Sequence, residues 1–288
     1  MAYMVLSFFT PLMGRLGSIP SDVIIGVLCG IFVWLVGSFL TPKLMTSAYV
    51  NRLVQILLVV AVLGFAFSFT LKPYDFEHPK RMVAMHTVRE FHNMTDFYVD
   101  SGIWTVTMDD LGMNVIRYPY LSEIEYHAPG CHGLYCDLPF FFPIRDIYGG
   151  PTLSWYHPGP PPKLPFQPKL NFVSSYDAKT NVRRVNGSIE GTSHNNLFIE
   201  SHTKLKRWSF LDHIPVHDRE SFFVFLASSK QQTKWNFWLE LEGNETIELA
   251  FSSHFLDTVT PELTKFHNRL PNYVDDFTWV TYWARWTL

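Results

Sequence analysis

Two long stretches without a charged side chain, residues 23–40 and 53–71, constrain this chain more than any other feature of its sequence. As a helix, the shorter one would cover roughly 27 Å, close to the ~30 Å hydrocarbon core of a bilayer. The segment that joins them is short, so the pattern predicts a transmembrane helical hairpin with the lipid bilayer as its partner. The alternative is a buried hairpin in a large soluble core, which the near-absence of charge disfavours.

The composition of the chain changes near residue 72. Residues 1–71 contain only four charged side chains, whereas residues 72–288 carry nearly all the charge. We therefore expect a membrane region at 1–71 and a separate domain at 72–288. The apolar stretch 1–13 is too short to span a bilayer and contains Pro11, so it is expected to be the tail of an upstream membrane helix.

Glycosylation sequons indicate on which side of the membrane residues 72–288 lie. Asn93, Asn186 and Asn244 each begin an Asn-x-Ser/Thr triplet without a central proline, and all three follow the second apolar stretch. We predict that these asparagines carry glycans, which places the domain in the lumen of the secretory pathway.

A pair of cysteines agrees with an oxidising compartment. Cys131 and Cys136 are separated by four residues, a spacing that closes a small disulfide ring. His127 and His132 lie close by, so a zinc site is the alternative. The compartment and the glycine and proline residues of this loop favour the disulfide.

After residue 72 the apolar residues alternate with polar ones, which is typical of half-buried strands. This alternation occurs at 104–108, 235–241 and 247–255. Residues 222–226 are apolar throughout and predict a central strand covered on both faces, with further strands at 197–199 and 279–283. Residues 261–270 predict a helix. The fold class is therefore a mixed membrane protein, with an N-terminal transmembrane hairpin followed by a mainly antiparallel β-sandwich.

The remaining segments predict connections rather than sites. Residues 149–168 are rich in proline and glycine and predict an extended crossing without ladder pairing. Trp155 and Tyr156 could form a sugar platform, but core packing is the simpler interpretation. His213 and His217 flank a proline and predict a surface loop. The acid pairs at 109–110 and 275–276 predict turns.

No motif for catalysis is present in the sequence. It has no His-Glu-x-x-His helix, no Cys-x-x-Cys pair and no Gly-x-Ser-x-Gly elbow, so we predict no catalytic residue, no metal ligand and no cofactor in this chain. A net charge of −3, without basic runs among aromatic residues, argues against nucleic acid as a partner.

Several short motifs resemble the C-terminal part of the endoplasmic reticulum metallopeptidase family, membrane-bound relatives of zinc aminopeptidases. The matching segments occur in the same order as in that family. They are Phe9-Thr10-Pro11, Gly14-Arg15, His86-Thr87-Val88-Arg89, Phe91-His92, Asp100-Ser101-Gly102-Ile103-Trp104, Cys131 and Cys136 followed by Leu138-Pro139, Phe223-Val224-Phe225, Trp235-Asn236-Phe237-Trp238-Leu239-Glu240, and Ser253-His254-Phe255-Leu256.

This resemblance implies a non-catalytic membrane anchor and lumenal accessory domain in the endoplasmic reticulum membrane. In the family, zinc belongs to a peptidase domain that this chain does not resemble, so the chain is expected to be inactive alone. Its implied partner is a metallopeptidase domain or another lumenal protein. The alternative is a free-standing, membrane-anchored lumenal module that binds glycans or client proteins.

Overall fold

The structure is a computed structural model that describes residues 21–44, 48–68, 70, 74–92, 97–108, 111–113, 116, 137, 139, 154–215, 221–230 and 232–288. The chain divides into two compact units. The first comprises Met1–Lys80, Met108–Asp110 and Asn272–Asp275, and the second comprises Arg81–Thr107, Leu111–Pro271 and Asp276–Leu288.

The first unit contains helices α2 (Ser21–Leu44) and α3 (Ala48–Ser68). Within the described part of the chain, no helix combines the length and the hydropathy that a bilayer crossing needs. The prediction of a transmembrane hairpin, and with it the mixed membrane fold class, is therefore wrong. The stretch 1–13 lies outside the described residues.

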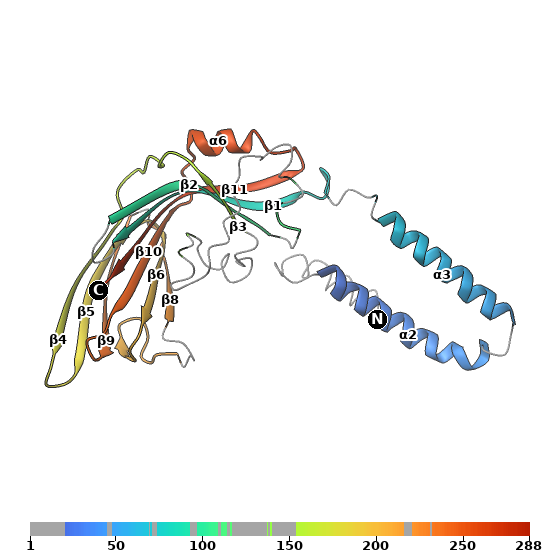
Figure 1. The fold of residues 1–288 in the computed structure, drawn as a ribbon, viewed down its shortest axis with the longest axis horizontal. Helices are drawn as coiled ribbons and strands as arrows, with labels where there is room; N and C mark the ends of the chain where they lie inside the picture. Colours follow the sequence, from blue (N-terminus) through green and yellow to red (C-terminus); the bar gives the residue numbers. More distant parts are fainter. Residues whose placement is uncertain are drawn as a thin grey trace. The chain divides into compact units, whose positions relative to one another are not determined.

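The strands form one seven-stranded and one four-stranded sheet (Figure 1). The larger sheet has the order β3-β2-β1-β11-β10-β6-β8 and the smaller one the order β4-β5-β9-β7. The strands are β1 (Lys80–His92), β2 (Phe97–Thr107), β3 (Ser154–Pro158), β4 (Lys169–Asp177), β5 (Val182–Gly191), β6 (His194–Ser201), β7 (Leu205–Trp208), β8 (Ser221–Ala227), β9 (Thr233–Glu242), β10 (Ile247–Phe255) and β11 (Val274–Thr287). Each pairing with a defined register is antiparallel.

Aromatic side chains join the two sheets of the second unit. Phe172 of β4 contacts Trp286 of β11 edge to face, with 6.1 Å between ring centroids. Trp208 of β7 meets Phe222 of β8 in the same way at 5.4 Å. Such pairs add about 0.5–1.5 kcal/mol to the burial of their area. The β-rich part is therefore built from two packed antiparallel sheets.

Strand positions were predicted better than strand environments. The segments 104–108, 235–241 and 247–255 overlap β2, β9 and β10. However, β2 and β10 are buried on both faces over most of their length, so they are not half-buried strands. Conversely, β8 lies at an edge of its sheet rather than at the centre.

Two predicted connections belong to strands. Residues 154–158 form β3 and pair with β2, so the prediction of an unpaired crossing is wrong for this part of 149–168. An edge position tolerates this segment, because its first proline is Pro158 at the strand end. The acids at 275–276 lie in β11 rather than in a turn, and Asp276 binds His267 at 2.6 Å.

Helix α6 (Pro261–His267) confirms the helix predicted at 261–270. Thr260 caps its N-terminus by accepting a hydrogen bond from the Leu263 amide at 3.4 Å. Pro261 occupies the first turn, where its missing N–H has no cost. Leu263 and Phe266 are buried, so the helix is attached through its apolar face.

Candidate functional site

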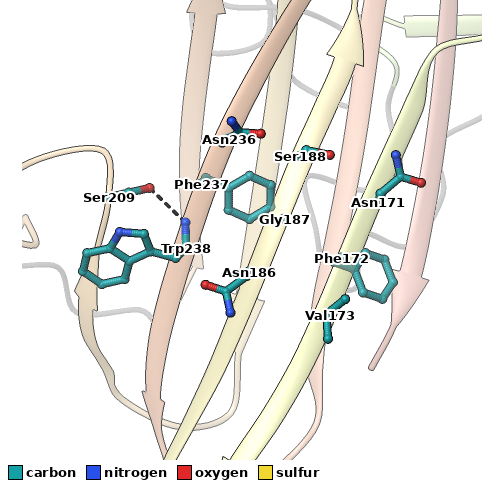
Figure 2. Close-up of a pocket in the computed structure, with 10 residues that line it drawn as sticks. All are labelled: Asn171, Phe172, Val173, Asn186, Gly187, Ser188, Ser209, Asn236, Phe237 and Trp238. Atoms are coloured by element: carbon teal, nitrogen blue, oxygen red, sulfur yellow. Dashed lines mark hydrogen bonds between the residues drawn. The ribbon is translucent and has the colours of Figure 1, made fainter.

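A shallow groove of about 580 Å³ lies on the outward face of the four-stranded sheet (Figure 2). Strand register builds it from two rows of side chains. One row is Asn171, Ser188 and Asn236, and the next is Val173, Asn186 and Trp238. We call these six residues the neutral strip, because none of them is charged.

Rows of paired charges bound the neutral strip on both sides. On one side, Lys234 Nζ lies 2.6 Å from Glu190 Oε1, and this hydrogen bond lowers the pKa of the Glu190 carboxyl. On the other side, Arg184 Nη1 lies 3.0 Å from Glu240 Oε1, and Arg207 Nη2 lies 2.8 Å from Glu240 Oε2. Each carboxylate beside the strip is therefore paired with at least one basic side chain, Glu190 with Lys234 and Glu240 with both arginines.

Two inward-facing residues, Gly187 and Phe237, lie between the two rows of the strip. The Phe237 ring lies under Gly187, where an added Cβ would be only 2.4 Å from Phe237 Cζ. Glycine at this position therefore lets the buried ring approach the backbone. At the end of the rows, the Trp238 amide donates to Ser209 Oγ at 3.0 Å, which fixes the loop after β7 to β9.

The chemistry of the strip suits recognition rather than bond breaking. Its asparagines supply both amide donors and carbonyl acceptors, and Ser188 supplies a hydroxyl. Trp238 and the 71% exposed Val173 supply apolar surface. Among the ten described residues that line the groove, none is an acid, a base, a histidine or a cysteine. These lining residues offer no general base and no metal ligand.

A buried polar network around His254 superficially resembles a catalytic pair. Ser252 Oγ lies 3.0 Å from His254 Nε2, and Thr281 Oγ1 lies 3.1 Å from His254 Nδ1. His254 and Ser252 are fully buried, so no substrate can reach them. Burial, with a smaller contribution from His194, lowers the pKa of His254 to about 3. The ring is therefore neutral and structural.

His86 is likewise held on both ring nitrogens. Its Nδ1 lies 2.7 Å from Thr260 Oγ1, and its Nε2 lies 2.8 Å from the Pro160 carbonyl oxygen. The carbonyl can only accept, so Nε2 carries the proton and Nδ1 accepts from the threonine hydroxyl. Burial lowers the pKa of His86. The side chain ties the proline-rich segment to the start of α6.

Other positions of the resemblance motifs are also structural. Arg89 Nε donates to Asp100 Oδ1 at 2.8 Å, and Arg89 Nη1 donates to the Asp137 carbonyl at 2.8 Å. The guanidinium carbon of Arg89 lies 4.7 Å from the Trp104 ring centroid. These contacts join β1, β2 and Asp137. The motif residues therefore have a packing role and not a catalytic one.

The predicted site residues are divided between described and undescribed parts of the chain. Asn186 is exposed on β5 and Asn244 is exposed in the β9–β10 turn, so glycosylation of both stays a prediction. Asn93, Cys131, Cys136, His127 and His132 lie outside the described residues, together with His217 and the acids at 109–110. His213 lies exposed in the loop after β7, and Trp155 is a core residue with 3% exposure.

Sequence reasoning missed the neutral strip because it did not predict β4 and β5. A signal for this hairpin exists in the turn between the strands. Asp177 Oδ1 accepts from the Lys179 amide at 2.9 Å, and Asn181 has a positive φ of 51°. Aspartate and asparagine at such positions are typical turn residues, so 177–181 could have indicated a hairpin.

Comparisons with known proteins agree on one family. Residues 77–286 match the family described as endoplasmic reticulum metallopeptidase 1, C-terminal domain. Endoplasmic reticulum metallopeptidase 1 of Rattus norvegicus is 29% identical over 308 residues, covering 96% of this chain and 33% of the relative. The Homo sapiens protein of the same name is 27% identical over 305 residues, with the same coverage. The chain thus spans about a third of the length of these relatives.

A solved structure gives only a weak likeness. The yeast delta-COP-I mu-homology domain complexed with Dsl1 WxWxV peptide aligns with a TM-score of 0.30 and 8% identity, covering 75% of this chain and 98% of that one. This likeness carries no argument about function. The family match covers most of the chain, and the chain therefore belongs to the family of the endoplasmic reticulum metallopeptidase 1 C-terminal domain.

Proposed function

We propose that this chain is a non-catalytic accessory domain of a metallopeptidase in the endoplasmic reticulum, with residues 72–288 on the lumenal side. The observation that carries the proposal is the match of residues 77–286 to the C-terminal domain of that family. The compartment is taken from the names of the relatives. Asn186 and Asn244 are exposed, which glycosylation on the lumenal side would require.

The arrangement of side chains supports a role without catalysis. A zinc peptidase needs about three protein ligands around its metal and a group that activates water. Among the described residues, no three His, Cys, Asp or Glu side chains are placed to hold an ion. Of the histidines that the structure describes, the buried ones are His86 and His254, and both have their two ring nitrogens engaged. Zinc would then be a cofactor of the peptidase partner and not of this chain.

Peptidase activity of the purified chain provides the first test. With added zinc, it should hydrolyse fluorogenic aminoacyl substrates no faster than a buffer blank, and a chelator should change nothing. Zinc content measured by mass spectrometry should be substoichiometric. Chelator-sensitive hydrolysis that follows the chain through gel filtration, free of any other peptidase, would refute the proposal.

Addition in trans tests the accessory role itself. The chain should bind the peptidase region of the rat relative and raise its melting temperature, because a partner that binds only the folded state stabilises it. A heat-denatured sample of the chain controls for added protein. If the chain neither binds that region nor changes its stability or activity, the accessory role is wrong, whatever the peptidase assay shows.

The neutral strip favours one alternative function, a free-standing module that binds glycans. Amide side chains beside the half-buried Trp238 and the exposed Val173 suit the hydroxyls and apolar faces of a sugar. The test is a glycan array probed with the wild-type chain and with Trp238→Ala. Binding that the substitution abolishes supports this alternative, and an array without hits contradicts it for free glycans.

A further inference from the structure

The sequon Asn186-Gly187-Ser188 lies at the centre of the neutral strip. Cross-strand register places Asn186 between Val173 and Trp238, and Ser188 between Asn171 and Asn236. Figure 2 shows the Asn186 amide between these two apolar side chains. A glycan attached here would begin inside the groove rather than beside it.

The amide of Asn186 is free to carry a sugar. Its Oδ1 accepts a hydrogen bond from Arg184 Nε at 3.2 Å, which orients the side chain. Its Nδ2 makes no hydrogen bond with any described residue. N-glycosylation uses Nδ2 and leaves Oδ1 as an acceptor, so the contact with Arg184 is compatible with the modification.

The groove offers the contacts that the first sugars of a glycan need. A pyranose ring has apolar C–H faces, which pack on aromatic and aliphatic side chains, and hydroxyls and acetamido groups, which bind amides. Val173 is 71% exposed in the middle of β4, an edge strand. Exposed apolar residues on an unpaired edge invite association with other chains, and native proteins cover such edges.

We propose that the N-linked glycan of Asn186 folds back onto the neutral strip, with its first sugars packed between Trp238 and Val173 and hydrogen-bonded to the row of Asn171 and Asn236. In the attachment step, Asn186 Nδ2 bonds to C1 of the first N-acetylglucosamine and loses a proton. The lipid diphosphate of the lipid-linked oligosaccharide donor leaves from the same carbon. The strip is then occupied by the chain's own carbohydrate.

This inference rests on lumenal placement and not on the accessory role proposed above. The sequon has a structural explanation of its own, because Gly187 is required by the Phe237 ring. Glycosylation of Asn186 therefore has to be measured first. Asn244 is the internal control, since it is exposed in the β9–β10 turn, and a glycan there would project into solvent.

The first experiment measures glycan release from the native full-length chain, expressed in mammalian cells. A peptide N-glycosidase is added in heavy-oxygen water, and peptide mass spectrometry follows each asparagine over time. Release at Asn186 should be about tenfold slower than at Asn244, equivalent to about 1.4 kcal/mol of protection, and the difference should vanish after denaturation. An unoccupied Asn186, or equal native rates, would overturn the proposal.

The second experiment separates packing on Trp238 from simple crowding by the sheet. Trp238→Ala should accelerate native release at Asn186 and leave Asn244 unchanged. Ser188→Ala removes the sequon but keeps Asn186, and Ser188→Thr keeps both. With the glycan present, Trp238→Ala should lower Tm by about 2–4 °C more than in the Ser188→Ala background. Additive effects would contradict the proposal.

A milder variant covers the case in which Trp238→Ala does not fold. Trp238 also lies under the Arg184 guanidinium, whose central carbon is 4.9 Å from the ring centroid. Trp238→Phe keeps an aromatic ring there while reducing the apolar area. It should accelerate release at Asn186 to an intermediate rate, and an unchanged rate would exclude packing of the glycan on this side chain.

Discussion

At the scale of single residues, Gly187 is the position where one added carbon has the largest effect. A Cβ at this position would lie 2.4 Å from Phe237 Cζ, inside the packed interior of the sheet. We expect Gly187→Ala to lower the free energy of unfolding by about 1–3 kcal/mol, because the ring must move. Urea denaturation measures the change. Gly159→Ala is the matched control, because its added Cβ would meet only Gly102 Cα at 4.0 Å. It should lower the free energy of unfolding much less.

The neutral His254 predicts how stability depends on pH. Its pKa is about 3 in the folded state, against an ordinary value of 6.5, so the unfolded state binds the proton first as pH falls. The contribution of the neutral His254 ring to the stability of the fold is complete above about pH 6.5 and is lost as pH falls toward 3. Between pH 7 and 5, the wild type should lose roughly 2 kcal/mol more than His254→Gln.

Chemical denaturation at a series of pH values tests this difference. His202→Gln, at an exposed position, controls for the removal of a histidine. The contradicting result is the same dependence on pH for the free energy of unfolding of the wild type and of His254→Gln. In that case the buried ring is not held neutral in the folded state, and the structural role given to it is wrong.

At the scale of elements, the sequence identified strands but misjudged which of them are central. The alternation in 247–255 suggested a solvated face, yet Ser252 and His254 of β10 are fully buried. They are tolerated because they bind each other and Asn196, with 2.9 Å between Asn196 Nδ2 and His254 Nε2. Alternation alone cannot separate polar residues that face water from polar residues that satisfy one another. The apolar β8 shows the converse, because an edge strand can be apolar throughout.

The candidate site was less predictable than the fold. Its residues lie on three strands, β4, β5 and β9, and only antiparallel register brings them together. The sequon at Asn186 was recognisable from the sequence, but its neighbours Trp238 and Val173 were not, since they are 52 and 13 residues away. Register depends on turn geometry and on pairing across the whole sheet.

The N-terminus of α6 provides a prediction for an element. Thr260 Oγ1 accepts from the Leu263 amide and donates to His86 Nδ1 at 2.7 Å, so it caps the helix and satisfies a buried ring. Thr260→Ala should lower the free energy of unfolding by roughly 2–3 kcal/mol, since both contacts are lost. Thr260→Ser keeps the hydroxyl and should recover most of this loss. Equal losses in both variants would show that the methyl group, not the cap, is responsible.

At the scale of the whole molecule, the described strands and α6 all begin at or after Lys80, whereas α3 exposes large apolar side chains. Leu63 and Phe65 of α3 are 63% and 67% exposed. Surface of this kind promotes association in water. A chain shortened to residues 74–288 should therefore remain folded, and it should scatter less light than the full chain at equal concentration.

The choice of residue 74 as the new start follows from contacts within the first unit. Lys80 is fully buried, its amide donates to the Tyr273 carbonyl at 2.8 Å, and Tyr74 stacks on Tyr273 at 6.5 Å. The 74–288 chain keeps these contacts, so its Tm should stay within about 2 °C of the full chain. The 81–288 chain loses them and should melt several degrees lower, because about 1 kcal/mol corresponds to 2–4 °C at this size. If 74–288 fails to fold while the full chain folds, the stability of the sheets depends on α2 and α3. The inference that the sheets fold without these exposed helices would then be wrong.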